Sequence, residues 1–389
     1  MTASKKGEEK TICKHLRVCN GCPRMSDLYS IQEEKKQKTI HETLQNYVEE
    51  EVVLFEPAES LSYYRNKLDW WYDSNHQLGF RHKQNKRQAI FTPHCLLCSS
   101  EAQQVYQKLE KILKESNLPN YDVLLHEGYL RYILLRESKS EKKRIIGIIT
   151  FTTEHEKEIE SIAQKLLETK LVHGVQWIHN ATWSDTANGK MVKSWGKITL
   201  TETINGMEFE YGFQSFFQTN PKMAEKMQSH VVNLVEKNEK VLDLYCGVGF
   251  FSIPLAKKGN TVLGLELIEE AVSFARKNAE KNNISNVSFQ IADVPKYLNK
   301  LRDEKKEFDC VILDPPRSGL SKKIWRRVLR LNPKKLIYIS CNPIALKRDL
   351  EWLKEYTSFT IESAKTFDLF PHTEHVETVV SIMVGKPQP

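Results

Sequence analysis

The second half of the chain alternates strand-like and helix-like segments, and this alternation constrains the fold more than any other feature. Short apolar runs are each followed by a segment with helical periodicity. Such repetition predicts a parallel, doubly wound α/β sheet. Two later runs have no helix between them and predict an antiparallel hairpin at the sheet edge. The first group of runs lies at residues 239–245, 261–266, 286–293, 308–316 and 335–340, and the hairpin at 358–368 and 376–384.

The first half has a different pattern, which predicts an α+β domain. A charged amphipathic helix is predicted over residues 27–50, followed by a strand meander over 60–93. We therefore expect an N-terminal α+β domain over residues 1–209 and a catalytic α/β domain over 210–389. The apolar stripe of the first helix is predicted to be Leu28, Ile31, Ile40, Leu44 and Val48. Further helices are predicted at 100–116 and 155–170, and strands at 129–136, 144–152 and 173–180.

The composition indicates where in the cell the protein is located and what kind of partner it can bind. No apolar run approaches the roughly 20 residues that a membrane span needs, and the N-terminus has no apolar signal segment. We therefore expect a cytoplasmic protein without membrane contact. The net charge of +7 fits a solvated surface and also fits a polyanionic partner such as RNA.

Basic and aromatic side chains are interleaved over residues 63–87. This pattern can grip phosphates and stack bases in an RNA-binding surface. It fits equally well an aromatic core with solvated basic residues, so the pattern leaves both interpretations open.

Eight cysteines in a cytoplasmic chain indicate metal binding or catalysis before disulfides. Cys13, Cys19 and Cys22 lie within ten residues, with Gly21 allowing a tight loop, and a second pair follows at Cys95 and Cys98. Thiolates select zinc or iron–sulfur clusters. The spacing alone leaves zinc and an iron–sulfur cluster equally open.

A glycine turn follows the first strand of the second half. The turn between Asp243 and Gly249 lets a ligand approach the backbone, but it lacks the third glycine of a dinucleotide site. Glu266 ends the second strand, Asp293 the third and Asp314 the fourth. This layout resembles class I methyltransferases, and therefore implies an S-adenosylmethionine site that includes these acids.

Cys341 follows the last parallel strand, at the sheet edge where open α/β folds place their chemistry. A thiolate can add to carbon 6 of uracil and so activate carbon 5 toward a methyl donor; a general base must then remove the carbon 5 proton. Glu377 is the predicted base, with Glu374, His372 and His375 as rivals. Arg317 replaces the aromatic residue that would favour methylation of an exocyclic base nitrogen.

Several segments together resemble the RNA uracil-5-methyltransferase family. The resemblance implies that Cys341 is the nucleophile, that Glu377 is the base, and that Gln218, Tyr245, Glu266 and Asp314 bind the cofactor. Phe250 departs from the family, where many members have Asn, and this puts one polar cofactor contact in question. The similar segments are 216–227, 241–256, 313–320, 339–343 and 372–380.

The cysteine loop resembles the branch that modifies 23S ribosomal RNA and carries a [4Fe-4S] cluster. That resemblance implies cluster ligands at Cys13, Cys19, Cys22 and Cys95, with Cys98 spare. The loop begins at residue 13 with no oligonucleotide-binding barrel before it, as in the short ribosomal-RNA enzymes. We expect a monomer that methylates 23S ribosomal RNA. Transfer RNA is the alternative substrate, and a non-catalytic RNA-binding or ribosome-assembly factor is a third possibility.

Overall fold

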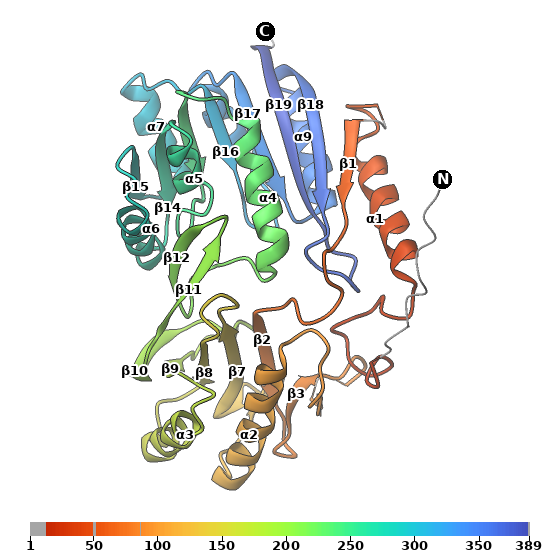
Figure 1. The fold of residues 1–389 in the computed structure, drawn as a ribbon, viewed down its shortest axis with the longest axis vertical. Coiled ribbons are helices and arrows are strands. Elements are labelled where there is room, and N and C mark those ends of the chain that lie inside the picture. The colour runs from red at the N-terminus through yellow and green to blue at the C-terminus, as the bar shows by residue number, and fades with distance from the viewer. Residues whose placement is uncertain (1–12, 50–51, 86, 388–389) are drawn as a thin grey trace.

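The computed structural model describes residues 13–49, 52–85 and 87–387. Within these residues the chain forms two large sheets, one above the other in Figure 1, with the β11–β12 hairpin between them. The upper sheet has eight strands in the order β1-β18-β19-β17-β16-β13-β14-β15. The lower sheet has seven, in the order β10-β9-β8-β7-β2-β3-β4.

The upper sheet contains the five predicted parallel strands. Its hairpin, β18 (Thr357–Phe367) with β19 (Glu377–Pro387), is antiparallel as predicted. The sheet edge is instead β1 (Val53–Glu56), an unpredicted strand that pairs parallel with β18. The parallel strands are β13 (Lys240–Leu244), β14 (Thr261–Glu266), β15 (Val287–Ile291), β16 (Cys310–Leu313) and β17 (Lys335–Ser340).

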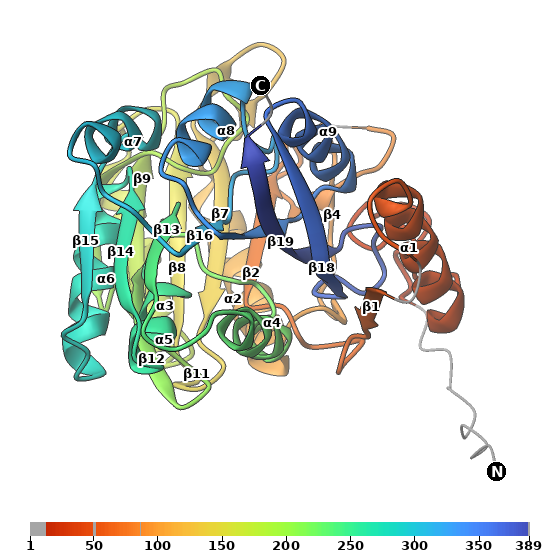
Figure 2. The ribbon, with the colours of Figure 1, turned by 90° about the horizontal axis from the view of Figure 1, so that it is seen from above.

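Helices cover both faces of this sheet (Figure 2), which confirms the doubly wound architecture. Alternate residues of one strand enter different cores: Val241 packs in the core with α4, α5 and α6, and Leu242 in the core with α1, α7, α8 and α9. The first group is α4 (Pro221–Leu234), α5 (Ser252–Lys257) and α6 (Glu269–Lys281). The second is α1 (Tyr29–Leu44), α7 (Val294–Asp303), α8 (Lys322–Leu329) and α9 (Pro343–Lys354).

The lower sheet packs α2 (Ser100–Ser116) and α3 (Glu156–Glu168) against one face. Its other face shares a core with the hairpin β11 (Thr199–Ile204) and β12 (Met207–Gly212). A small hairpin pairs β5 (Tyr121–Asp122) with β6 (Glu127–Gly128). The lower-sheet strands are β2 (Lys67–Tyr72), β3 (Leu78–Arg81), β4 (Ala89–Ile90), β7 (Leu130–Glu137), β8 (Arg144–Thr150), β9 (Gly174–His179) and β10 (Lys190–Gly196).

The predicted apolar stripe of α1 is wrong in its first half. Leu28 and Ile31 are 49% and 39% exposed, whereas Ile40 and Leu44 are buried as predicted. The buried face begins instead with polar side chains, among them Lys36, whose Nζ lies 2.7 Å from Asp368 Oδ1. Hydrophobic periodicity cannot report a face that is buried through hydrogen bonds and an ion pair.

The division at residue 209 stays a prediction. Helix α1 and strand β1 precede that boundary, and both pack with the upper sheet. Among the described residues, no helix combines the length and the apolar character that crossing a bilayer requires.

Candidate active site

Cys341 lies directly after β17, and the residues around it fix the turn. Asn342 caps α9 by accepting a hydrogen bond from the Ile344 amide at 3.1 Å, and Pro343 takes the first helical position. The Asn342 side chain also donates to the Arg317 carbonyl at 3.1 Å. The turn after β16 is thereby held beside the thiol.

Glu377 is the first residue of β19 and is 8% exposed. Strands β17 and β19 are antiparallel, and Ser340 pairs with Thr378. The residue after Ser340 therefore lies opposite the residue before Thr378, so Cys341 and Glu377 face each other. Two of the predicted site residues, about forty positions apart in sequence, are thus brought together by strand register.

The charges around Cys341 oppose its ionisation. Burial, followed by the charges of Glu377 and Asp314, raises the pKa of the Cys341 thiol to about 11, and Arg317 acts to lower it. Burial raises the pKa of Asp314 to about 7 and that of Glu377 well above its usual value. Burial therefore favours the protonated form of both carboxyl groups.

The rival bases occupy other environments. The Glu374 side chain is 68% exposed and is paired with Arg24. His372 is buried, and its ring contacts Gln32 Nε2 at 3.3 Å and the Leu61 carbonyl at 2.9 Å. His375 is exposed. Among these candidates, Glu377 alone is a buried acid opposite Cys341, although its role stays a prediction.

A cavity lies beside the glycine turn that follows β13. Three predicted cofactor residues, Gln218, Tyr245 and Asp314, line it. Gly247 has a φ of +53° and no atom within 4 Å of where a Cβ would stand, so the backbone is open to a ligand there. Tyr245 also has a positive φ, of 67°, which is unusual for a residue with a side chain.

Glu266 and Asp293 do not line this cavity. Glu266 accepts hydrogen bonds from the amides of Gly247, Leu267 and Ile268 at 3.2, 2.7 and 2.9 Å. Asp293 caps α7 by accepting from the Lys296 amide at 3.0 Å. Both acids have structural roles in the described protein, and their cofactor roles stay predictions.

Phe250, the departure from the family pattern, forms part of the apolar wall of the cavity. Its ring packs against Phe217 and Phe251 at centroid distances of 5.9 and 4.9 Å. Sequence reasoning missed Phe216 and Phe217, which also line the cavity. The signal was present, because both precede Gln218 in the segment that carried the resemblance.

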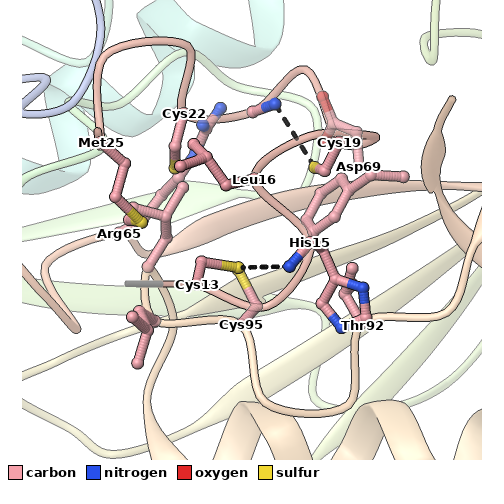
Figure 3. A pocket seen from close by; sticks show the side chains of 14 residues that line it. Cys13, His15, Leu16, Cys19, Cys22, Met25, Arg65, Asp69, Thr92 and Cys95 are labelled. Carbon is pink, nitrogen blue, oxygen red and sulfur yellow. Dashed lines mark hydrogen bonds between the residues drawn. The ribbon is translucent and has the colours of Figure 1, made fainter. Parts of the chain in front are cut away.

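The four predicted ligand cysteines line a second cavity, of about 260 Å³ (Figure 3). Three come from the N-terminal loop and Cys95 comes from the segment after β4. All eight cysteines of the chain are free thiols, and Cys98 is buried outside this cavity. Backbone amides donate to two of the sulfurs at 3.4 Å, from His15 to Cys13 and from Gly21 to Cys19.

A metal site is not shown by this geometry. Across residues 13–49, 52–85 and 87–387, no group of three or more His, Cys, Asp or Glu side chains is arranged to hold a metal ion. Four soft sulfur donors around one cavity nevertheless fit the chemistry of a thiolate-bound group.

Residues 28–384 match the family model described as tRNA (Uracil-5-)-methyltransferase. The chain belongs to this family. The prediction of an RNA uracil-5-methyltransferase is therefore confirmed at the level of the family.

Relatives extend the comparison over nearly the whole chain. The tRNA (uracil(54)-C(5))-methyltransferase of Pyrococcus furiosus is 32% identical over 367 residues, covering 94% of this chain and 84% of the relative. An uncharacterized RNA methyltransferase of Caldanaerobacter subterraneus is also 32% identical, covering 96% and 84%.

A solved structure shows the same fold. The Pyrococcus abyssi tRNA (uracil-54, C5)-methyltransferase, in complex with S-adenosyl-L-homocysteine, superposes with a TM-score of 0.76 at 30% identity, covering 95% of this chain and 86% of that one. This likeness confirms the predicted methyltransferase fold. Both Pyrococcus relatives are named as transfer RNA enzymes. They give no support to the predicted 23S ribosomal RNA substrate.

Proposed function

We propose that this protein transfers a methyl group from S-adenosylmethionine to carbon 5 of a uridine in RNA, with Cys341 as nucleophile and Glu377 as base. The observation that carries the proposal is the strand register that sets Cys341 opposite Glu377 at the end of β17. Membership of the family supplies the reaction class.

The proposed reaction has three steps: addition of the sulfur to the ring, methyl transfer and elimination of the sulfur. The Cys341 thiol first loses its proton to solvent; the thiolate sulfur then bonds to carbon 6 of uracil, and the electron pair of the C5–C6 double bond moves toward oxygen 4. Carbon 5 then takes the methyl group. Glu377 removes the carbon 5 proton, the C5–C6 double bond re-forms, and the sulfur leaves carbon 6 as a thiolate. The uridine must be flipped out of its stack to reach Cys341.

A cationic cosubstrate bound in the cavity beside Gly247 would favour the ionised form of the acids there. Asp314 lines it, and the nearby Asp243 is fully buried with no hydrogen-bond partner for Oδ1 among the described atoms. When bound, S-adenosylmethionine supplies the methyl group and leaves as S-adenosylhomocysteine, the compound in the Pyrococcus abyssi complex. Gln218, Tyr245 and Asp314 would hold it.

Transfer RNA is the substrate that the relatives favour, and ribosomal RNA is the second candidate because of the cysteine loop. We expect formation of 5-methyluridine in tRNA transcripts when they are compared side by side with 23S ribosomal RNA fragments. Cys341→Ala should abolish the product while leaving S-adenosylmethionine binding, measured by calorimetry, unchanged. Methylation of the 23S fragments alone would replace transfer RNA as the substrate, and turnover by Cys341→Ala would remove the nucleophile assignment.

We further propose that the cysteine cavity holds a [4Fe-4S] cluster through Cys13, Cys19, Cys22 and Cys95. All four sulfurs surround one cavity, and Cys98 offers a matched control because it is buried outside it. Protein purified without oxygen should contain iron and acid-labile sulfide. Cys95→Ala should lose both, whereas Cys98→Ala should retain both. A colourless protein that contains one zinc ion would contradict the cluster.

A further inference from the structure

Helix α1 contacts the segment that delivers the proposed base. Residues 368–376 connect β18 to Glu377, the first residue of β19. Tyr29, Gln32 and Lys36 are spaced three and four residues apart on α1, so they share one helix face. All three are buried. This polar face, rather than an apolar stripe, is what the first turns of α1 bury.

Lys36 and Tyr29 hold the start of the segment. Lys36 Nζ lies 2.7 Å from Asp368 Oδ1, with side chains that are 4% and 0% exposed. The same ammonium donates to the Phe370 carbonyl at 3.1 Å, and the Tyr29 hydroxyl donates to Asp368 Oδ2 at 2.9 Å. Asp368 itself accepts from the Phe370 amide at 3.1 Å. Four hydrogen bonds thus hold Asp368 and Phe370 in place.

Gln32 holds the middle of the segment and joins it to the cysteine loop. Its Oε1 accepts from the His372 amide at 2.8 Å, and its Nε2 donates to the carbonyls of Arg24 and Asp27 at 3.0 and 3.1 Å. The Arg24 amide in turn donates to the His372 carbonyl at 2.9 Å. His372 has a φ of +69°, a strained conformation that persists only where neighbours enforce it.

A buried lysine–aspartate pair is a poor source of stability, because apolar side chains of similar volume serve as well. Its directional contacts instead fix geometry. We propose that Gln32 and Lys36 are positioning residues for the reaction: through residues 368–376 they set where the Glu377 carboxylate lies relative to Cys341. This inference rests on the proposed function, since it assigns the residues that aim its base.

The inference predicts which step fails. Formation of the Cys341–carbon 6 bond and methyl transfer precede the use of Glu377 as a base, and they depend on its position only through its charge beside the thiol. Removal of the carbon 5 proton does depend on it, and without that step the carbon–sulfur bond is not released by elimination. A misplaced Glu377 therefore leaves methylated RNA covalently attached to the protein.

The test compares Gln32→Met with Gln37→Met, and Lys36→Met with Lys38→Met. Gln37 and Lys38 are exposed on the same helix and serve as matched controls. A tRNA transcript and S-adenosylmethionine are mixed with each full-length protein, and the covalent adduct is followed on denaturing gels. We expect Gln32→Met and Lys36→Met to slow adduct resolution by about 10–100-fold, the loss that a displacement of about 1 Å can cause. Both controls should stay within about twofold of the wild type, and Lys36→Arg should restore part of the rate.

Lys36→Met leaves Asp368 buried without its cation and can unfold the protein. The double variant Lys36→Met with Asp368→Asn removes both charges and keeps the test valid, and the same slow resolution is expected. Resolution at the wild-type rate in the folded variants would overturn the inference. An equal loss of adduct formation and resolution would also overturn it, because that is the pattern of a purely structural role. A wild-type protein that forms no adduct and no 5-methyluridine would instead refute the proposed function.

Discussion

The Cys341 thiol lies at the end of β17, and its surroundings favour the protonated form. Burial and the charges of two neighbouring acids raise the pKa of this thiol to about 11, and the Arg317 guanidinium acts to lower it. A thiolate, not a thiol, attacks carbon 6. Arg317 acts to lower the pKa of Cys341 and so favours the thiolate that the proposed reaction needs.

Arg317→Gln tests this role. Loss of the cation should raise the thiol pKa, so the pH profile of adduct formation should shift toward higher pH. A shift of half to one pH unit corresponds to a roughly threefold to tenfold slower reaction at pH 7. Single-turnover rates between pH 6 and 10 give the profile, and an unshifted profile would show that Arg317 does not act on the thiol.

Glu377→Gln removes the proposed base and leaves the volume of the side chain almost unchanged. Methyl transfer should proceed, while the protein–RNA adduct should persist because the carbon 5 proton has no acceptor. Glu374→Gln is the matched control, since that side chain is exposed. Prompt resolution by Glu377→Gln, measured as loss of the adduct over time, would assign the base elsewhere.

The residues of the proposed catalytic pair, Cys341 and Glu377, could be named from sequence because each stands in a short motif at a strand end. Gln218, Tyr245 and Asp314 were named for the same reason, and all three line the cavity beside Gly247. The supporting contacts could not be named in this way. Asp368 and Gln32 are 336 positions apart, and neither stands in a motif that points to the other.

At the scale of elements, strand and helix order followed from sequence more securely than helix orientation did. The predicted runs 261–266 and 335–340 coincide with β14 and β17, because β-branched and apolar runs of this length fit a buried parallel sheet. Helix α1 was found, but its first buried turns are polar. Strand β1 was missed because four residues give too short a pattern to recognise.

Helix α9 offers an element-scale prediction, since Asp349 ties it to two neighbouring segments. The buried Asp349 carboxylate accepts from the Leu320 amide at 2.7 Å and the Tyr338 hydroxyl at 2.6 Å. Asp349→Ala would leave both donors without a partner, and we expect a loss of about 2–4 kcal/mol in the free energy of unfolding. Urea titration measures it. The exposed Glu351→Ala is the control, and equal stability of the two variants would contradict the prediction.

At the scale of the whole molecule, the two sheets meet in a shared hydrophobic core. Trp71 of the lower sheet lies in this core, and Trp70 lies in the core between the lower sheet and helices α2 and α3. Trp70 and Trp71 are buried, so the core interpretation is confirmed for them. Arg81 stacks 4.3 Å above Trp71 and pairs with Asp185. Sequence could not decide this, because alternation assigns side chains to two faces without saying which face another layer covers.

Buried acids at the core of the upper sheet predict how stability depends on pH. Burial raises the pKa of Asp243 from 3.8 to about 7. Between pH 3.8 and about pH 7, Asp243 keeps a proton in the folded protein that it has lost in the unfolded chain. The group therefore stabilises the fold at low pH, and this contribution is lost as the pH rises through about 7.

Asp243→Asn should remove this dependence. The difference in thermal stability between variant and wild type should move in favour of the variant from pH 5 to pH 8, because histidine contributions cancel in the difference. Differential scanning calorimetry of the ligand-free proteins measures it. A constant difference across this range would show that Asp243 is ionised throughout.

The central claim is that Cys341 forms a covalent bond to a uridine whose carbon 5 is methylated. A tRNA transcript containing 5-fluorouridine tests it most directly, since fluorine at carbon 5 cannot be removed as a proton and the adduct is trapped. With S-adenosylmethionine present, mass spectrometry of the digested complex should find a methylated fluorouridine attached to the Cys341 peptide. The absence of an adduct with both tRNA and 23S transcripts, or its attachment to another cysteine such as Cys246, would contradict the claim.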